Sequence, residues 1–318
     1  MSYLLIALGL VCLVAGGEAL VRGAVQAARR LGVSPLLIGL TLVGFGTSTP
    51  ELLTSLTAAL QDAPGVAVGN VVGSNIANIL LILGGTAAIA AIPTAREALW
   101  RDGAALTIAS LACLAVVLWG EAGRLAGVGL LALLAGYLVY TIRRERRAPD
   151  AAAALHAGEA ELAGPAPQNL WLAGALAAGG LLLTLLGARL LVTGAIDLAA
   201  AAGLSETLIG LTVVAIGTSL PELTASLIAA LRRQGDLALG NILGSNIFNI
   251  LGILGVTALV HPISVPAEIA TLDIWVMLGA TAAMLVFALS GARLSRWEGA
   301  TLFAGYIGYL AWLAAGAV

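Results

Sequence analysis

Two segments of this chain, residues 34–84 and 205–255, repeat one another at a constant offset of 171 positions and without a gap. The residues are identical at 31 of the 51 aligned positions. The first copy reads SPLLIGLTLVGFGTSTPELLTSLTAAL and then GNVVGSNIANILLILG, and the second reads SETLIGLTVVAIGTSLPELTASLIAAL and then GNILGSNIFNILGILG. Whatever fold the chain adopts must therefore contain the same pair of apolar segments twice.

The rest of the chain is as apolar as the two copies. Hydrophobic residues make up 60% of the 318 residues, charged residues make up only 10%, and the mean hydropathy is +1.03. Soluble proteins carry about 25% charged residues. Apolar runs of roughly 17–25 residues, the length of a helix that crosses a bilayer, recur throughout. The sequence thus predicts an all-α integral membrane protein. Cys12 and Cys113 have no metal-ligand spacing, and we expect both to be free packing residues.

Ten transmembrane helices fit the apolar runs, and we expect the first to be retained because it lacks the basic start of a signal peptide. They span about 3–27, 36–60, 66–90, 102–119, 124–142, 170–195, 205–231, 237–260, 272–290 and 298–316. The polar, proline-containing stretch 143–169 is too hydrophilic to cross the membrane. The predicted domains are a first five-helix half, 1–142, this linker, and a second five-helix half, 170–318.

Arginine sets the predicted orientation, since the chain has fifteen arginines and no lysine. If the linker is cytoplasmic, the loops on its side hold nearly all of them, as the positive-inside rule requires. Both termini then lie outside the cell membrane. Because each half has an odd number of spans, the second half is inverted relative to the first. Two inverted repeats are typical of secondary transporters, which bind their substrate near the membrane midplane.

Glu51 and Glu222 occupy equivalent places in the two copies, each within an apolar span. A charged residue at the centre of a transmembrane helix costs roughly 2.5–3.5 kcal/mol on insertion scales, so two such residues need a compensating role. A pair of protonated, hydrogen-bonded structural carboxyls is one explanation. A cation held between two carboxylates explains both the cost and the duplication, and it is the interpretation that we favour.

The residues before each glutamate also favour an ion site. In GTSTPE and GTSLPE a proline precedes the glutamate, where it removes the helical hydrogen bond to the carbonyl of Gly46 or Gly217. Helices broken in this way at the midplane can present free carbonyl groups to an ion. A plain proline kink is the alternative. Hydroxyl ligands are available beside the two breaks from Thr47, Ser48, Thr218 and Ser219.

The second segment of each copy adds amide and hydroxyl groups. Ser74 and Asn78 share a helix face, as do Ser245 and Asn249, because the members of each pair lie four residues apart. We predict that Asn78 and Asn249 contribute to the ion site and that some asparagines of the motif hydrogen bond between helices instead. The less favoured ligands are Asn70, Asn75, Asn241 and Asn246. Oxygen ligands without histidine or cysteine suit a hard cation such as Ca²⁺, whose charge matches two glutamates. Mg²⁺ fits less well because it gives up its water reluctantly.

The motifs GTSTPE and GNVVGSNIAN, with GTSLPE and GNILGSNIFN, closely resemble the α-repeats of the sodium/calcium exchanger family, within the cation/calcium antiporter superfamily. The resemblance implies exchange of Ca²⁺ for about three Na⁺ by alternating access, with the first two helices of each half sliding over a rigid core. It implies that Glu51 and Glu222 bind both ions. Some relatives have aspartate in place of Asn249, so dependence on potassium is not expected here. Oxygens for sodium are implied at Thr47, Ser48, Ser74, Thr218, Ser219 and Ser245.

Sodium-driven Ca²⁺ antiport is therefore the predicted function. Proton-coupled cation antiport is the alternative, because buried glutamates can also carry protons, although that branch typically has GN where this chain has GTS. A channel or an intramembrane enzyme agrees less well with inverted repeats and with spans that lack a catalytic set of residues. We expect no enzymatic activity, no cofactor, no nucleic acid and no required protein partner. The expected partners are Ca²⁺, Na⁺ and membrane lipid.

Overall fold

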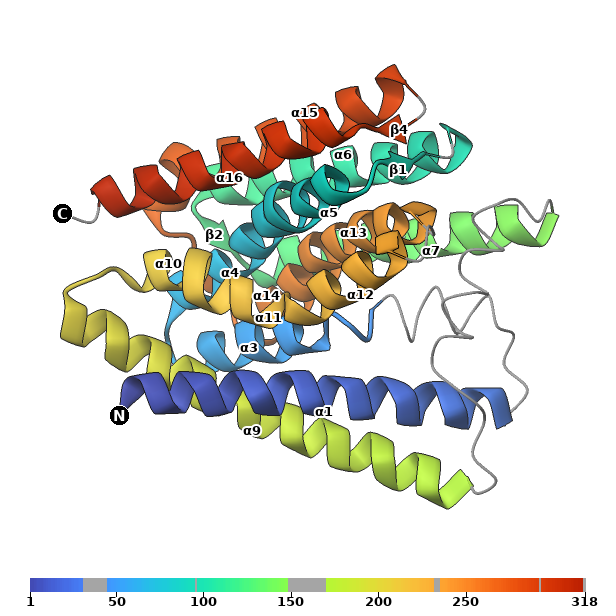
Figure 1. Ribbon diagram of the computed structural model, residues 1–318. Helices are drawn as coiled ribbons and strands as arrows, with labels where there is room; N and C mark the ends of the chain where they lie inside the picture. The colour runs from blue at the N-terminus through green and yellow to red at the C-terminus, as the bar shows by residue number, and fades with distance from the viewer. Residues whose placement is uncertain (31–44, 95, 148–169, 232–234, 292, 317–318) are drawn as a thin grey trace.

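The computed structural model describes residues 1–30, 45–94, 96–147, 170–231, 235–291 and 293–316, and this part of the chain is almost wholly helical (Figure 1). Before the linker lie α1 (Ser2–Arg30), α3 (Thr49–Leu60), α4 (Pro64–Ile76), η2 (Ala77–Leu83), α5 (Gly84–Ile89), α6 (Arg96–Trp119) and α7 (Arg124–Arg147). After it lie α9 (Leu170–Ala202), α10 (Glu206–Ile209), η3 (Gly210–Val214), α11 (Ala215–Thr218), α12 (Leu220–Leu231), α13 (Gly235–Phe248), η4 (Asn249–Leu254), α14 (Gly255–Val260), η5 (Ile269–Asp273), α15 (Ile274–Ser290) and α16 (Arg296–Gly316). Elements labelled η are π-helical.

Within the described residues, seven helices are long and apolar enough to cross a membrane, and an eighth is formed if the bent pair Glu206–Thr218 and Leu220–Leu227 is one span. The prediction of an all-α membrane protein is therefore confirmed, whereas the number of ten spans stays a prediction. Part of the predicted span 36–60 falls in 31–44, outside the described residues. The predicted span 298–316 corresponds to α16, which is helical but not among the seven.

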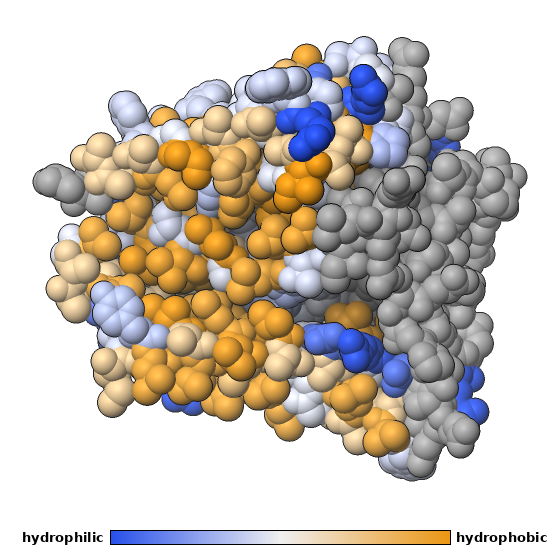
Figure 2. Space-filling model, viewed as in Figure 1, coloured by the Kyte–Doolittle hydropathy of each residue, from blue (hydrophilic) through white to orange (hydrophobic). Residues whose placement is uncertain are grey.

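The repeated segments form the centre of the molecule. α4, η2 and α5 follow one another as a composite helix, as do α13, η4 and α14, and 94% and 78% of the most apolar stretches of these two helices are buried. The corresponding share is only 28% for α1, which therefore lies at the periphery. Figure 2 shows a largely hydrophobic outer face, as contact with lipid requires, and hydrophilic residues gather toward the end where α7 ends and α9 begins. α1 begins and α16 ends at the opposite end (Figure 1).

α1 and α9 pack as a long antiparallel pair because glycines remove side chains from their interface. A Cβ atom added to Gly180 would lie 2.3 Å from the backbone nitrogen of Leu20, so no larger residue fits there without movement. The contacts are reciprocal: Gly9 meets Gly187, Gly16 meets Gly180, and a shift of 171 positions converts one pair into the other. Interfaces of small residues are typical of helices that associate in lipid.

Two short strand pairs join the halves. β1 (Ile92–Pro93) pairs antiparallel with β4 (Arg293–Leu294), and β2 (Glu121–Ala122) pairs antiparallel with β3 (Ile263–Ser264). The offset of 171 superimposes β1 on β3 and brings β2 to within one residue of β4. Each half thus supplies the strand that completes a sheet of the other. The sequence did not predict these strands, because two residues are too few to show the alternation of polar and apolar side chains.

Candidate ion-binding site

The backbone leaves the helical conformation at the same place in both copies. Ser48 has φ −87° and ψ 11°, and Ser219 has φ −83° and ψ 11°. A new helix begins at the next residue, α3 in the first copy and α12 in the second. Each has its proline, Pro50 or Pro221, at the second position, where the missing N–H group breaks no helical hydrogen bond. In the second copy the axis bends by 44° across this break.

Glu51 and Glu222 lie in the first turn of α3 and α12. The unpaired N–H groups and the helix dipole favour negative charge at this position. The two residues are 1% and 0% exposed, and the charge of Glu222 acts directly on Glu51. Two neighbouring carboxylates that are both shielded from water repel each other strongly, so the pair requires a cation or a proton for compensation.

One detail of the predicted break is wrong. The proline was expected to leave the carbonyl of Gly46 free, but this oxygen accepts a hydrogen bond from the backbone N–H of Thr49 at 3.1 Å. The chain tightens at the break, so an N–H three residues along replaces the missing one four residues along. A free carbonyl at Gly217 stays a prediction.

Serine hydroxyls connect the two glutamates crosswise. Ser48 Oγ donates to Glu222 Oε1 at 3.1 Å, and Ser219 Oγ donates to Glu51 Oε1, also at 3.1 Å. The two bonds are equivalent under the offset of 171, and all four side chains are buried. The predicted hydroxyls Thr47 and Ser245 also lie beside the Glu222 carboxylate, and Thr218 lies beside that of Glu51. The predicted residues of the two breaks are therefore brought together at the interface of the two copies.

Several buried oxygens in this region have no hydrogen-bond partner. They include the second carboxylate oxygens of both glutamates, the amide oxygens of Asn78 and Asn249, and the hydroxyl of Ser245, and the amide oxygen of Asn75 and the hydroxyls of Thr54 and Ser226 share this property. A buried polar atom without a partner costs about 1–3 kcal/mol, and more if it is charged. Atoms of this kind require an explanation, and carboxylate, amide and hydroxyl oxygens are the ligands that a hard cation prefers.

The asparagines of the motif make several kinds of hydrogen bond. Asn78 Nδ2 donates to Asn246 Oδ1 at 2.9 Å, and Asn249 Nδ2 donates to Ser74 Oγ at 3.0 Å. Both bonds link the two copies, and each holds an amide by its nitrogen and leaves its oxygen available. By contrast, Asn70 Nδ2 donates to Ser55 Oγ at 2.8 Å and ties α4 to α3. Asn70 Oδ1 also accepts a hydrogen bond from Thr218 Oγ1 of the other copy at 3.1 Å. Asn75 Nδ2 instead donates within its own helix, to the carbonyl of Val71 at 2.7 Å, so the interhelical role holds for Asn70 and Asn246 but not for every asparagine of the motif.

Two features of the site were not predicted. η2 begins immediately before Asn78, and η4 begins at Asn249, so both composite helices widen into π-helical turns at the same residue of the repeat. Single π-helical turns occur frequently at functional sites.

The second feature is an aromatic contact between the two copies. The ring of Phe45, three residues before the break at Ser48, stacks on the ring of Phe248, the residue before Asn249, with centroids 4.3 Å apart. The equivalent residues in the other copy are Ile216 for Phe45 and Ala77 for Phe248. The aromatic rings are therefore not duplicated, and the repeat did not indicate this contact.

The chemistry of the site is that of a hard cation. Among the residues that the structure describes, no three His, Cys, Asp or Glu side chains converge as metal ligands, so Glu51 and Glu222 supply the only carboxylates here. The remaining groups are hydroxyl and amide oxygens. Zinc and copper favour nitrogen and sulfur, whereas calcium and sodium favour oxygen.

Comparison with known proteins agrees with this geometry. The model of the family described as "Sodium/calcium exchanger protein" matches residues 1–143 and 172–315. The chain belongs to the sodium/calcium exchanger family. The match covers both helical halves and stops on either side of the linker.

Full-length relatives and solved structures are similar to this family member along its whole length. Putative antiporter CaxA of Alkalimonas amylolytica is 42% identical over 304 residues, which cover 95% of each chain. Sodium/calcium exchanger MaX1 of Methanosarcina acetivorans is 35% identical over an alignment of 340 positions, gaps included, that covers 97% of each chain. A solved structure of the sodium-calcium exchanger NCX_Mj has a TM-score of 0.66 and 34% identity, with coverage of 98% of this chain and 97% of that one.

These findings establish a membrane antiporter of the cation/calcium type. The family and its structural neighbours are exchangers rather than enzymes, and the helical fold is that of the NCX_Mj structures. The ion that drives transport and the orientation in the membrane are separate questions.

Proposed function

We propose that this protein exchanges Ca²⁺ for Na⁺ across the cell membrane by alternating access. The observation that carries the proposal is the buried Glu51–Glu222 pair, with reciprocal serine bonds and one unpartnered oxygen on each carboxylate. Ca²⁺ neutralises both charges at once, and Na⁺ ions do so separately. The proposed ligands are the ten predicted residues: Glu51, Glu222, Thr47, Ser48, Thr218, Ser219, Ser74, Ser245, Asn78 and Asn249.

The same pair explains why ions would exchange rather than leak. Removing an ionised group from water costs several kcal/mol even after the protein relaxes. Two carboxylates enclosed without a cation bear that cost twice and also repel each other. The protein can therefore reach the occluded state, in which the site is closed to both sides, only when an ion is bound. Such a site can change its access side with one Ca²⁺ or with Na⁺ ions, but not empty.

The proposed architecture is ten helices in two inverted halves, 1–142 and 170–318, joined by a cytoplasmic linker and with both termini outside. The reciprocal contacts between α1 and α9 and the exchanged strands support it, because an inverted pair of halves makes each such contact twice. The end where α1 begins and α16 ends would face outward. The arginines of 143–147 follow the last predicted span before the linker, which favours a cytoplasmic position for that end.

Proton-coupled antiport is the second candidate function. It is compatible with the unpartnered Oε2 atoms of Glu51 and Glu222, because a proton can bind to each of them. Uptake of radioactive calcium into sodium-loaded proteoliposomes separates the two candidates. Sodium coupling predicts uptake that follows the sodium gradient and persists when a protonophore collapses the pH gradient. Uptake that ignores the sodium gradient and follows the pH gradient would assign the protein to the proton-coupled branch.

A further inference from the structure

One hydrogen-bonded pair of the first copy is separated in the second. Asn70 Nδ2 donates to Ser55 Oγ at 2.8 Å and to the backbone carbonyl of Glu51 at 3.2 Å, so it ties α4 to α3. The offset of 171 converts this first pair, Asn70 and Ser55, into a second pair, Asn241 and Ser226. The Nδ2 atom of Asn241 and the hydroxyl of Ser226 are both buried, and neither has a hydrogen-bond partner.

The residues themselves are the same in both copies, so the difference lies in how the helices are placed. In each copy the serine lies four residues after the glutamate, and the asparagine belongs to a GN-x-x-GSN motif. Ser55 and Ser226 are both 0% exposed. A buried donor and a buried acceptor that could satisfy each other cost free energy while they stay apart. The structure therefore describes an arrangement in which the first pair is closed and the second pair is open.

The first pair is connected directly to the ion site. The amide of Asn70 that binds Ser55 also accepts the hydroxyl of Thr218, a proposed ligand from the other copy, at 3.1 Å. Through its Nδ2 atom the same amide holds the backbone of Glu51. A movement of α3 along α4 that separates Asn70 from Ser55 would therefore also shift the groups that surround the ion.

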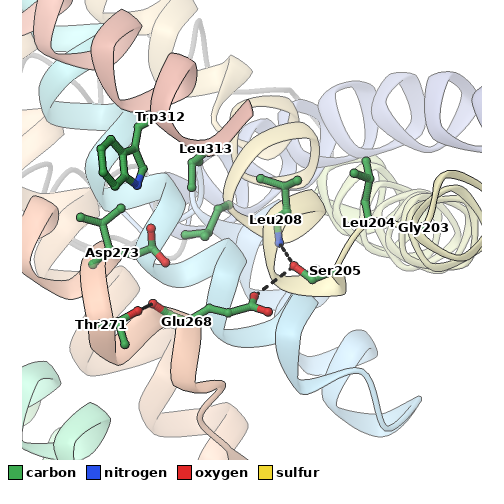
Figure 3. A pocket seen from close by; sticks show the side chains of 11 residues that line it. Gly203, Leu204, Ser205, Leu208, Glu268, Thr271, Asp273, Trp312 and Leu313 are labelled. Carbon is green, nitrogen blue, oxygen red and sulfur yellow. Dashed lines mark hydrogen bonds between the residues drawn. The ribbon is translucent and has the colours of Figure 1, made fainter. Parts of the chain in front are cut away.

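The first pair lies toward one end of the molecule. α4 begins beside α10, since a Cβ atom on Gly65 would lie 2.8 Å from the backbone nitrogen of Thr207. The next residue, Leu208, lines an open pocket of about 450 Å³ at the end where α9 leads into α10 and α16 ends (Figure 3). Asn70 follows Gly65 by five residues, so the first pair lies between this end and the ion site. In the proposed inverted architecture the second pair lies on the opposite side of the site.

We propose that the two asparagine–serine pairs are alternating latches, the first closed in one access state and the second closed in the other. The proposal rests on the alternating access proposed above. In inverted repeats a change of access side exchanges the conformations of the two repeats. The bond that is closed in the first copy here is then open, and its equivalent in the second copy is closed. Each latch stabilises its own state, and the balance between the latches sets how often the site faces each side.

Calcium affinity measured separately from the two sides tests the latches. Calcium exchange is followed in right-side-out and in inside-out membrane vesicles. The ratio of the two half-saturating Ca²⁺ concentrations reports the populations of the access states, because an apparent dissociation constant rises as the competent state becomes rarer. Ser55→Ala and Ser226→Ala should shift this ratio in opposite directions, each by roughly fivefold, as expected for the loss of one hydrogen bond. The double variant loses both latches and should return to the parent ratio.

Ser110→Ala is the matched control, because it removes a buried serine hydroxyl of α6 that has no partner, and it should leave the ratio unchanged. Size-exclusion profiles establish that each variant is folded. If Ser55→Ala is not, Ser226→Ala decides alone, since it breaks no bond in the arrangement described here. Unchanged ratios, shifts in the same direction, or a double variant that does not return to the parent ratio would overturn the latches while leaving calcium exchange intact. A parent protein that exchanges no calcium in either kind of vesicle would refute the proposed function and the latches together.

Discussion

At the scale of single residues, the central feature is that each serine hydroxyl serves the glutamate of the other copy. Ser48 donates to Glu222 and Ser219 donates to Glu51, so neither carboxylate is positioned by its own helix alone. Each bond occupies one oxygen and leaves the other without a partner. The hydrogen bonds that hold the two acids thus come from neutral donors, and under the proposed function the transported ion balances their charge.

Glu51→Gln and Glu222→Gln test this balance one charge at a time. Glutamine keeps an oxygen that can accept the serine bond, and it is cheaper than glutamate within the membrane, so both variants should fold. Each should abolish calcium transport because one negative charge cannot match Ca²⁺. Radioactive calcium uptake into proteoliposomes measures the effect. Glu18→Gln, in the exposed Glu18–Arg22 pair of α1, is the control and should transport normally. Wild-type flux in either buried-site variant would refute the paired-carboxylate site.

The residues that meet between the two copies could be singled out from the sequence, but their connections could not. Glu51 and Glu222 stood out because a charge in an apolar span is costly and because both copies carry it. The crosswise bond from Ser48 to Glu222 joins residues 174 positions apart, so it depends on how the copies meet in space.

At the scale of helices, the predicted breaks at the prolines are present, whereas the π-helical turns at Asn78 and Asn249 were not expected. A proline has a local cause and a local effect, so its position in the sequence is enough. A π-helical turn adds one residue to a helical turn and persists where tertiary packing accommodates it. No single residue type in the sequence therefore predicts its position. The turns η2 and η4 both coincide with an asparagine whose amide reaches the other copy.

Neighbouring glycines in α9 provide a test of the close contact between α1 and α9. A Cβ atom on Gly180 would meet the backbone of α1 at 2.3 Å, whereas one on Gly179 would meet nothing within 4 Å. Gly180→Ala should therefore destabilise the protein by about 1–3 kcal/mol through overpacking. Gly179→Ala should be neutral or slightly stabilising, because alanine favours helices over glycine by about 1 kcal/mol. Thermal unfolding in detergent measures both, and equal melting temperatures would show that the helices are not in contact.

At the scale of the whole molecule, the proposed orientation can be tested by labelling. In a background without Cys12 and Cys113, cysteines at Gln61 and Glu206 should react with an impermeant thiol reagent added to intact cells. A cysteine at Arg144, beside the linker, should react only after the cells are opened. Reaction of the Arg144→Cys protein from outside would reverse the orientation that we derive from arginine.

The transport cycle should also respond to membrane potential. If about three Na⁺ leave for each Ca²⁺ that enters, one net positive charge moves outward per cycle. One elementary charge crossing 100 mV changes the free energy by ~2.3 kcal/mol, which shifts the equilibrium roughly fiftyfold. Calcium uptake by sodium-loaded proteoliposomes should thus accelerate when valinomycin and external potassium make the interior positive. A rate that is insensitive to the imposed potential would indicate electroneutral exchange.

The exchanged strands have a consequence for how the two halves fold. β1 pairs with β4 and β3 pairs with β2, so a half that folded alone would lack both of these pairings. Each half therefore depends on the other for its backbone hydrogen bonds at these strands. The two halves are thus expected to unfold together in one cooperative transition.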